Sequence, residues 1–318
     1  MTARRLLGLL LAGLVLAGCT QPAASSPASH HTQGPESAAD YPAARGIAAL
    51  RSGLDQKNQA APYYLALGDS LSQGVQPDAS GADEATDDGY PDLLASRIRT
   101  EIPGLRLVRL GCSGETTMTM IHGGSCRYPA GSQLAQAVRF LRAHRGQVAL
   151  ITLDIGANDP NSCVLGQPVS HMFSCLSGRI RATERDLATI LARIRAAAGP
   201  RVLIVGMNYY VPELGLWDRS QAGKELAILA EGLAAGGNQL LVARYHHYGA
   251  RVANVFAAFK STDFKAASSA GKTGPPPNVA AICSLTWMCA AAPRGPNEHA
   301  NPAGYLVIAD TFWKAITS

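Results

Sequence analysis

The sequence predicts an α/β fold in which helices cover both faces of a central parallel sheet. From residue 63 onward, short apolar runs alternate with longer segments whose apolar residues recur at helical spacing. Strands that alternate with helices form parallel sheets, because each crossover helix returns the chain to the same end of the sheet. The chain has 318 residues and is 47% hydrophobic, which is enough for a sizeable core.

The strand candidates are apolar runs that end in glycine or in a polar turn. The run 148–155 is the strongest of them. The predicted strands are 63–67, 105–110, 148–155, 201–205 and 252–255.

Segments with helical periodicity separate these runs. In the segment 132–144, for example, Leu134, Val138 and Leu141 lie on one helical face. Pro302 fits the first turn of the last helix, where a missing N–H is tolerated. The predicted helices are 90–101, 132–144, 180–198, 221–244 and 302–316, and the stretch 265–277, rich in Gly, Pro, Ala and Ser, is predicted to be a loop.

The N-terminus carries a predicted export signal. Residues 1–5 are basic, and the apolar stretch 6–17 has 12 residues, too few to cross a bilayer comfortably. The end of this stretch, Leu16-Ala17-Gly18-Cys19, resembles the lipobox of bacterial lipoproteins. The resemblance implies cleavage before Cys19 and lipidation of its thiol. A plain signal peptide followed by a chance cysteine is the alternative.

We therefore expect three regions. Residues 1–18 are a lipoprotein signal peptide, 19–60 are the lipidated cysteine and a flexible tether rich in Ser, Pro and Ala, and 61–318 form one folded domain. The mature protein is then expected outside the cytoplasm, anchored through Cys19 to the outer face of the cell membrane, or secreted.

The net charge does not indicate nucleic-acid binding. The formal charge is +5, and removal of Arg4 and Arg5 with the signal peptide lowers it to +3. No block of lysine or arginine stands out. We therefore expect no nucleic-acid partner.

Six of the seven cysteines remain after Cys19 is set aside. An even number in an exported protein suggests disulfides, and sequence proximity favours Cys112–Cys126, Cys163–Cys175 and Cys283–Cys289. Each pair would close a small loop, a stabilisation of roughly 2–3 kcal/mol in the chain-entropy model. Zinc binding is the alternative, but no CxxC pair is present.

Polar motifs follow the predicted strands, where a parallel sheet usually presents its ligands. The first is Gly68-Asp69-Ser70-Leu71. A serine there can act as a nucleophile, because free N–H groups of the following helix can stabilise an oxyanion. A helix-capping serine is the alternative.

Three further motifs follow in the same order along the chain. Gly111-Cys112-Ser113-Gly114 is a glycine turn, one residue short of a Gly-x-Ser-x-Gly elbow, so Ser113 is not predicted as a nucleophile. In Gly156-Ala157-Asn158-Asp159, the Asn158 amide can point at a developing negative charge, although asparagine is also common in turns. His299 lies just before the last predicted helix.

Together these motifs resemble the SGNH hydrolases, also called the GDSL family. The resemblance covers roughly residue 63 to the C-terminus and includes Asn301-Pro302-Ala303-Gly304-Tyr305 after His299. Phrases such as Thr286-Trp287-Met288-Cys289 are similar to secreted actinobacterial members. The resemblance implies a three-layer α/β/α sandwich of flavodoxin-like type and an enzyme that needs no metal and no cofactor.

The resemblance also assigns roles to residues. Ser70 would be the nucleophile, and His299 would be the general base that later protonates the leaving alcohol. The backbone N–H groups of Ser70 and Gly114 and the side chain of Asn158 would form the oxyanion hole. Loss of one such donor typically lowers turnover about 10²–10³-fold.

The sequence departs from the family at the residue that orients the histidine. The family usually has an aspartate two or three residues before it, but Asn297 and Pro296 stand there. We expect a backbone carbonyl of the segment 286–288 to accept the Nδ1–H of His299, which fixes the tautomer without a charge. The side-chain oxygen of Asn297 and the carboxylate of Glu298 are the alternatives.

The resemblance predicts a serine esterase or lipase that hydrolyses carboxylic esters of small molecules or lipids through an acyl-enzyme. An O-acetyl esterase or acyltransferase acting on carbohydrate would use the same residues, and an inactive binding lipoprotein is a third hypothesis, motivated by the missing aspartate. The loops 76–88, 160–178 and 208–219, expected to line the substrate, have no recognisable pattern. The acyl-chain length, the alcohol and the oligomeric state are therefore not predicted.

Overall fold

The computed structural model describes residues 42–55, 61–164, 169–265, 267–269 and 272–318. The chain divides after Ser37, and the unit Ala38–Ser318 contains all of these residues. The predicted signal peptide, Cys19 and the tether up to residue 41 lie outside the described residues.

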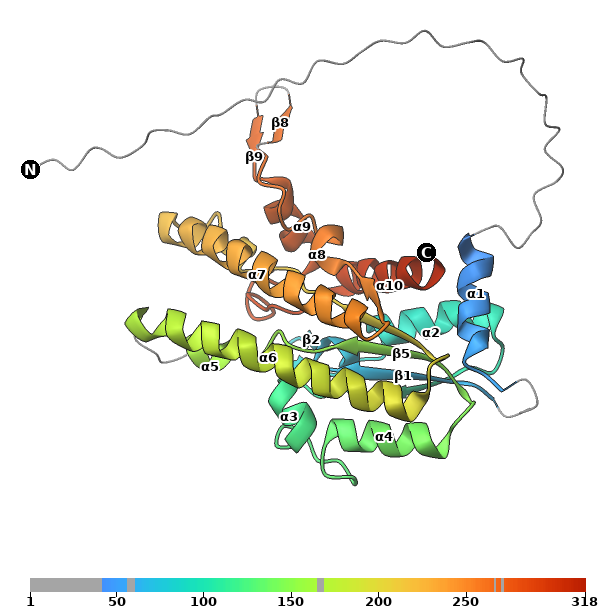
Figure 1. The fold of residues 1–318 in the computed structure, drawn as a ribbon. Helices are drawn as coiled ribbons and strands as arrows, with labels where there is room; N and C mark the ends of the chain where they lie inside the picture. The colour runs from blue at the N-terminus through green and yellow to red at the C-terminus, as the bar shows by residue number, and fades with distance from the viewer. Residues whose placement is uncertain (1–41, 56–60, 165–168, 266, 270–271) are drawn as a thin grey trace, which may run out of the picture. The chain divides into compact units, whose positions relative to one another are not determined.

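Five parallel strands form the central sheet (Figure 1). Their spatial order is β4 (Arg106–Arg109), β1 (Tyr63–Gly68), β5 (Val148–Asp154), β6 (Leu203–Met207) and β7 (Arg251–Ala253). Counted along the chain, these strands have the order 2-1-3-4-5 of flavodoxin-like folds. The winding direction switches between β1 and β5, and a ligand site is expected outside the carboxyl ends of these two strands.

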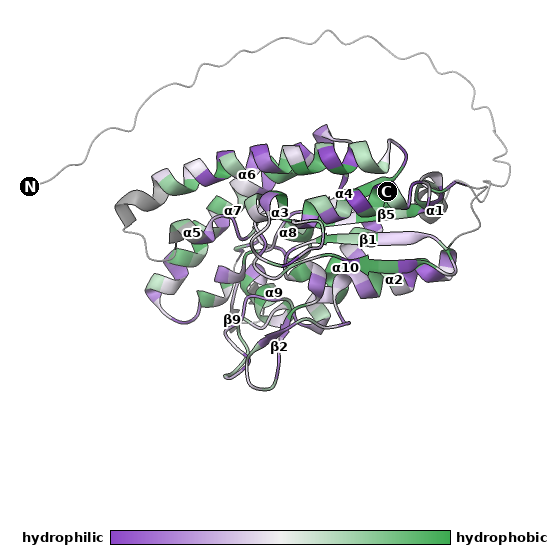
Figure 2. Ribbon diagram, turned by 90° about the horizontal axis from the view of Figure 1, so that it is seen from below, coloured by the Kyte–Doolittle hydropathy of each residue, from purple (hydrophilic) through white to green (hydrophobic). Residues whose placement is uncertain are grey.

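Helices cover both faces of the sheet, which confirms the three-layer α/β/α prediction (Figures 1 and 2). One layer holds α1 (Pro42–Ser52), α2 (Tyr90–Glu101) and α10 (Pro302–Thr317). The other holds α4 (Gln133–Ala143) and α6 (Val169–Ala198), with α7 (Gln221–His247) beside α6.

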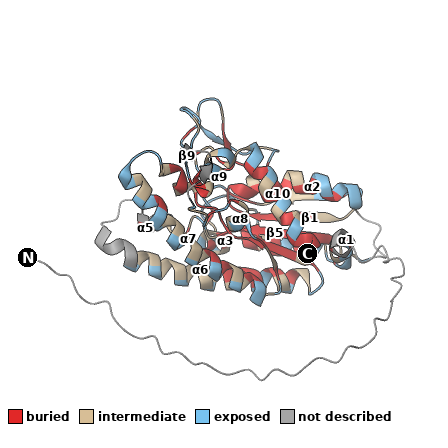
Figure 3. Cartoon of the chain, turned by 90° about the horizontal axis from the view of Figure 1, so that it is seen from above, coloured by how far each residue is buried: buried red, intermediate tan, exposed pale blue. Residues whose placement is uncertain are grey.

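The central strand β5 and its neighbours β1 and β6 form the buried middle of the sheet (Figure 3). β5 is buried along its whole length, and β1 is buried from Tyr64 to Gly68. Burial of their aliphatic side chains contributes about 25 cal/mol for each Å² removed from water, so this layer anchors the turns that follow both strands.

The predicted tether 19–60 overlaps a helix that belongs to the folded unit. α1 buries Ile47 and Leu50 in the core. Gly46 lies against α10, where a Cβ would come within 2.7 Å of the Thr317 Cα. The folded part of the chain therefore begins earlier than residue 61. The sequence pattern missed α1 because Ile47 and Leu50 are too few apolar residues to produce a recognisable helical periodicity.

Short elements connect these layers. They are η2 (Leu71–Gln73), the antiparallel pair β2 (Gln76–Pro77) and β3 (Asp83–Glu84), α3 (Thr117–His122), α5 (Asn161–Val164), η3 (Pro212–Leu216), α8 (Val255–Ala258), the antiparallel pair β8 (Ala267–Ser269) and β9 (Lys272–Gly274), and α9 (Pro277–Leu285). The stretch 265–277, predicted to be a loop, contains β8 and β9. Strands of two or three residues are too short to produce a detectable alternation in the sequence.

The three predicted disulfides, Cys112–Cys126, Cys163–Cys175 and Cys283–Cys289, are confirmed. These bonds use all six thiols, so the zinc alternative is wrong. The first disulfide closes the loop after β4, and the third joins α9 to the segment that precedes His299.

Candidate active site

Ser70 lies directly after β1, in the turn that leads into η2. Its side chain makes no helix-capping hydrogen bond, and its Oγ lies 2.9 Å from Nε2 of His299. Gly68 has a φ of +139°, and a Cβ at this position would lie 2.1 Å from the carbonyl oxygen of Asp154. Only glycine allows the backbone to come this close to β5, and this contact sets the direction of the turn.

The buried residues Asp69 and Asp154 hold this turn in place through hydrogen bonds. The Asp69 backbone N–H donates to the Asp154 carbonyl oxygen at 3.0 Å, and Oδ2 of Asp154 accepts from the Ser72 backbone N–H at 3.2 Å. Oδ1 of Asp69 accepts from the Leu71 N–H at 3.0 Å, and its Oδ2 accepts from the Tyr209 hydroxyl at 2.9 Å. The turn is therefore fixed by groups from β5, η2 and the segment after β6.

These two carboxyl groups differ in their electrostatics. Burial raises the pKa of Asp154 well above its ordinary value, and the nearby negative charge of Asp69 raises it further. Burial also raises the pKa of Asp69, but hydrogen bonds from Asp154, Leu71 and Tyr209 oppose that shift. The shared environment favours a proton on Asp154 and the negative charge on Asp69.

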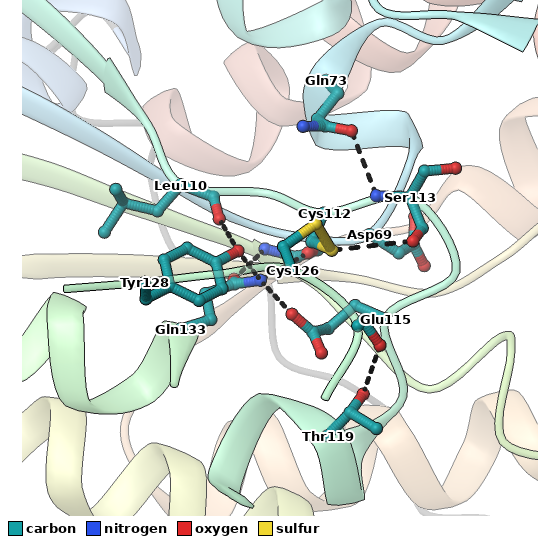
Figure 4. The surroundings of a disulfide bond; sticks show 12 residues. Asp69, Gln73, Leu110, Cys112, Ser113, Glu115, Thr119, Cys126, Tyr128 and Gln133 are labelled. Carbon is teal, nitrogen blue, oxygen red and sulfur yellow. Dashed lines mark hydrogen bonds between the residues drawn. A yellow bond between two sulfur atoms is a disulfide. The ribbon is translucent and has the colours of Figure 1, made fainter. Parts of the chain in front are cut away.

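The glycine turn after β4 is linked to the Ser70 turn through Gln133 of α4 (Figure 4). Oε1 of Gln133 accepts from the Gly68 backbone N–H at 2.7 Å, and its Nε2 donates to the Gly68 carbonyl and to Oε2 of Glu115, both at 2.9 Å. The Ser113 backbone N–H donates to Oε1 of Gln73 at 3.0 Å. Ser113 thus contributes its backbone to this junction.

Gly114 and Asn158 follow β4 and β5, the strands on either side of β1. Gly114 has a φ of +73°, a left-handed conformation that glycine adopts without strain. Nδ2 of Asn158 donates to the Glu115 carbonyl at 3.0 Å, which links the two loops. Within the described part of the chain, the second Nδ2 hydrogen and the backbone N–H groups of Ser70 and Gly114 have no acceptor. Three donors are thus free near Ser70.

Asp159 braces the loop that carries Asn158. Its carboxylate accepts from the Thr117 backbone N–H at the start of α3 and from the Thr183 hydroxyl on α6, both at 3.0 Å. Burial raises the pKa of Asp159, while the hydrogen bonds from Thr117 and Thr183 oppose the shift.

The segment around His299 is held against α9 and the segment after β6. The Trp287 N–H donates to the His299 carbonyl at 3.1 Å, and the Asn301 N–H donates to the Leu285 carbonyl at 3.0 Å. The Tyr210 hydroxyl donates to the Glu298 carbonyl at 2.8 Å. His299 is consequently only 6% exposed.

The partner of the His299 ring differs from the expected one. Oδ1 of Asn297 lies 2.9 Å from Nδ1 of His299 and also accepts the His299 backbone N–H at 2.9 Å. The expectation of a backbone carbonyl from 286–288 is therefore wrong, because the Trp287 carbonyl accepts from the N–H groups of Asn297 and Ala290 instead. The Asn297 side-chain oxygen, one of the alternatives, occupies this place.

A carboxylate from a distant part of the chain completes this arrangement. Nδ2 of Asn297 donates to Oδ1 of Asp83 at 2.7 Å, and the same oxygen lies 3.5 Å from Nδ1 of His299. Asp83 belongs to β3, in the loop 76–88 whose sequence shows no recognisable pattern. Among the described residues, the carboxylate of Glu298 makes no contact with the ring.

Sequence reasoning missed three residues of this site. Asp154 carried a signal, since it is an acidic residue at the end of the strongest predicted strand. Gln133 lies at the start of a predicted helix and has no pattern that separates it from a surface glutamine. Asp83 is 214 residues from Asn297, and nothing in the sequence joins them.

A protein-family model described as the GDSL-like Lipase/Acylhydrolase family matches residues 66–307. The comparison with curated proteins found no match. Among solved structures, an extracellular lipase from Streptomyces rimosus shares 20% identity over 79% of this chain and 99% of its own, with a TM-score of 0.47. A phospholipase A1 from Streptomyces albidoflavus shares 20% identity over 71% and 99%, with a TM-score of 0.42. An acetylxylan esterase from Geobacillus stearothermophilus shares 14% over 81% and 94%, with a TM-score of 0.46.

Proposed function

The chain belongs to the GDSL-like lipase/acylhydrolase family, and from this premise we propose that it is a serine esterase or lipase that hydrolyses carboxylic esters through an acyl-enzyme on Ser70. The observation that carries the proposal is the 2.9 Å separation between Ser70 Oγ and His299 Nε2. This pair lies at the winding switch of the sheet, where α/β folds bind their ligands.

The histidine tautomer follows from its partners. Oδ1 of Asn297 accepts the His299 backbone N–H, so the oxygen of this amide, not its nitrogen, faces the ring. Nδ1 must then carry a hydrogen, and Nε2 has a free lone pair. Ser70 O–H donates to that lone pair, which is the arrangement that a general base requires.

The reaction proceeds in two halves. Ser70 Oγ attacks the ester carbonyl carbon while its proton passes to Nε2, and collapse of the tetrahedral intermediate expels the alcohol with that proton. Water then attacks the acyl-enzyme in the same way and releases the acid. The N–H groups of Ser70 and Gly114 and the free Nδ2 hydrogen of Asn158 stabilise the oxyanion in both halves.

Hydrolysis of p-nitrophenyl esters of graded chain length tests this proposal. Ser70→Ala should abolish hydrolysis of every ester, whereas Ser113→Ala, the matched serine of the neighbouring turn, should retain it. Activity that survives in Ser70→Ala contradicts the mechanism. The same panel, extended to acetylated glycans, separates the lipid or small ester that we propose from the carbohydrate alternative.

The hypothesis of an inactive binding lipoprotein is no longer supported by the observation that suggested it. That hypothesis depended on a histidine without an orienting group, and Asn297 supplies an acceptor for Nδ1. Wild-type protein that fails to hydrolyse any ester, and fails to react with a fluorophosphonate, would restore it.

We also propose that the mature protein is extracytoplasmic and anchored to the outer face of the cell membrane through lipidated Cys19. The export signal supports this location, and three disulfides are typical of an oxidising compartment. In a bacterial host, wild-type protein should partition with membranes and Cys19→Ser should not. Wild-type protein with an uncleaved or unmodified N-terminus contradicts the anchor.

A further inference from the structure

We propose that Asp83, on the β2–β3 hairpin, is a positioning residue for His299 that acts through the side chain of Asn297. The inference rests on the proposed function, because it assigns His299 the role of general base. Three independent features of the described residues support it. They are the direction of the Asn297 amide, the negative charge of Asp83 beside the His299 ring, and the contacts that hold the β2–β3 hairpin in place.

Asp83 fixes the direction of the Asn297 amide. An ionised carboxylate only accepts hydrogen bonds, so the group 2.7 Å from Oδ1 of Asp83 must be the amide nitrogen. The amide oxygen then faces His299, where it meets the backbone N–H and Nδ1. A flipped amide would place NH₂ against the backbone N–H and would lose the Asp83 hydrogen bond. Asp83 therefore selects the Nδ1–H tautomer that leaves Nε2 free for Ser70.

Asp83 also places a negative charge beside the imidazole. Its Oδ1 is 3.5 Å from Nδ1, too far for a good hydrogen bond but close enough to stabilise the imidazolium that forms when Ser70 loses its proton. The His299 side chain is 7% exposed and that of Asp83 is 45% exposed, so solvent screens the attraction only in part.

Two other acidic residues, Asp69 and Glu298, lie near His299. Asp69 interacts electrostatically with His299 from beneath the nucleophile turn. Glu298 is the chain neighbour of His299, and its backbone is held by Tyr210. Of these three acidic groups, only Asp83 contacts the Nδ1 side of the ring within the described residues.

The hairpin is built to hold Asp83 in place. Oδ1 of Asp78 accepts from the N–H groups of Ser80 and Ala82, both at 2.8 Å, and so closes the turn between β2 and β3. At the tip, Gly81 has a φ of +89°, and a Cβ there would lie 2.2 Å from the carbonyl oxygen of Pro293. The tip thus rests on the segment that leads to Asn297.

Two substitutions separate the charge from the hydrogen bond. Asp83→Asn can still present an oxygen to the Asn297 amide but removes the charge, whereas Asp83→Ala removes both. For Asp83→Asn we expect kcat/KM to fall about tenfold, with most of the change in kcat, because the imidazolium is less stabilised. Asp83→Ala should lose about 10²-fold, because only the His299 backbone N–H then holds the direction of the amide.

The tautomer of the His299 ring is the readout that a purely structural role would not move. Glu84→Gln is the charge control, because it removes the same charge from the neighbouring exposed position of the hairpin. This control should keep kcat/KM within about threefold of wild type.

Exchanging the side chains of residues 83 and 297 should restore the activity that Asp83→Asn loses. In Asp83→Asn/Asn297→Asp the carboxylate accepts the Nδ1–H directly, and the amide introduced at position 83 donates to it. This double variant should recover kcat to within about threefold of wild type and restore the Nδ1–H tautomer of His299. Asn297→Asp alone should be worse than the swap, because it places two carboxylates in contact.

Nitrogen NMR of the His299 ring tests the same inference without turnover. Wild type and Glu84→Gln should show the Nδ1–H tautomer, and Asp83→Ala should show a mixture of tautomers. A ring spectrum of Asp83→Ala that matches that of Glu84→Gln overturns the inference, even if kcat or the thermal midpoint falls. Wild type without esterase activity would contradict the proposed function, and the ring spectra would still decide the role of Asp83.

Discussion

The two halves of the candidate active site are held in opposite ways. The Ser70 turn follows a strand that is buried from Tyr64 onward, and Asp154 and Gln133 each contact it through two or more hydrogen bonds. Within the turn, Asp69 accepts hydrogen bonds from Leu71 and from Tyr209. The His299 ring depends on one acceptor, Oδ1 of Asn297, which is held in turn by the half-exposed Asp83. The first half is a network, and the second is a chain of single contacts.

This difference predicts unequal sensitivity to substitution. In a network, loss of one hydrogen bond leaves the remaining ones to hold the geometry. In a chain of single contacts, loss of one residue leaves the next residue without the contact that holds its side chain in place. Substitutions that remove one contact should therefore reduce catalysis more on the His299 side, unless they remove a group that touches the reacting atoms.

The largest effect should come from such a group on the Ser70 side. Asn158→Ala removes the proposed oxyanion donor and should lower kcat about 10²–10³-fold with little change in KM. Asn161→Ala, which removes only a 3.3 Å hydrogen bond to the Asn158 side chain, is the matched control and should lose less than about threefold. Steady-state kinetics on a p-nitrophenyl ester measure both. Equal kcat values for the two variants would remove Asn158 from the oxyanion hole.

Two substitutions, each of which removes a contact from one half of the site, test whether the two halves differ in sensitivity. Asn297→Ala removes the side-chain oxygen that lies 2.9 Å from Nδ1 and should lower kcat about 10²-fold. Tyr209→Phe removes one of the hydrogen bonds to Asp69 and should lower kcat less than about threefold, with a loss of about 1 kcal/mol in the free energy of unfolding. Kinetics and urea denaturation of both variants provide the test. If Tyr209→Phe lost more activity than Asn297→Ala, the two halves would not differ as described.

The last prediction concerns the buried carboxyl pair, whose effect appears in stability and not in catalysis. Because the pKa of folded Asp154 is raised above its ordinary value of 3.8, the folded state keeps a proton that the unfolded state releases. Wild type should therefore lose free energy of unfolding as pH rises from about 4 toward 7, by at most about 1.4 kcal/mol for each pH unit. Asp154→Asn cannot titrate, so its stability relative to wild type should improve over this range. Parallel stability curves for the two proteins would contradict the raised pKa.

The Ser70 half of the site could be predicted from the sequence, because its residues directly follow strands. An apolar run that ends in Gly68 gives both β1 and the position of Ser70, and the apolar run of β5 places the loop of Asn158 beside it. Strand ends at one edge of a parallel sheet meet by topology alone, so local patterns along the chain suffice to bring these residues together.

The other half depends on contacts that no local pattern encodes. The contact of Asp83 with Asn297 joins residues 214 positions apart through a hairpin of two-residue strands. Half-exposed acidic residues are common on any surface, so neither composition nor periodicity distinguishes Asp83 from its neighbours. The helix α1 was missed for a related reason, since its burial comes from α10 at the opposite end of the chain.

The clearest test of the proposed mechanism is the site of covalent modification by a fluorophosphonate, mapped by peptide mass spectrometry. We expect a single adduct on the peptide that contains Ser70, none in Ser70→Ala, and a rate about 10³-fold lower in His299→Ala. An adduct on Ser113 or elsewhere, or an unchanged rate in His299→Ala, would contradict a Ser70 nucleophile activated by His299.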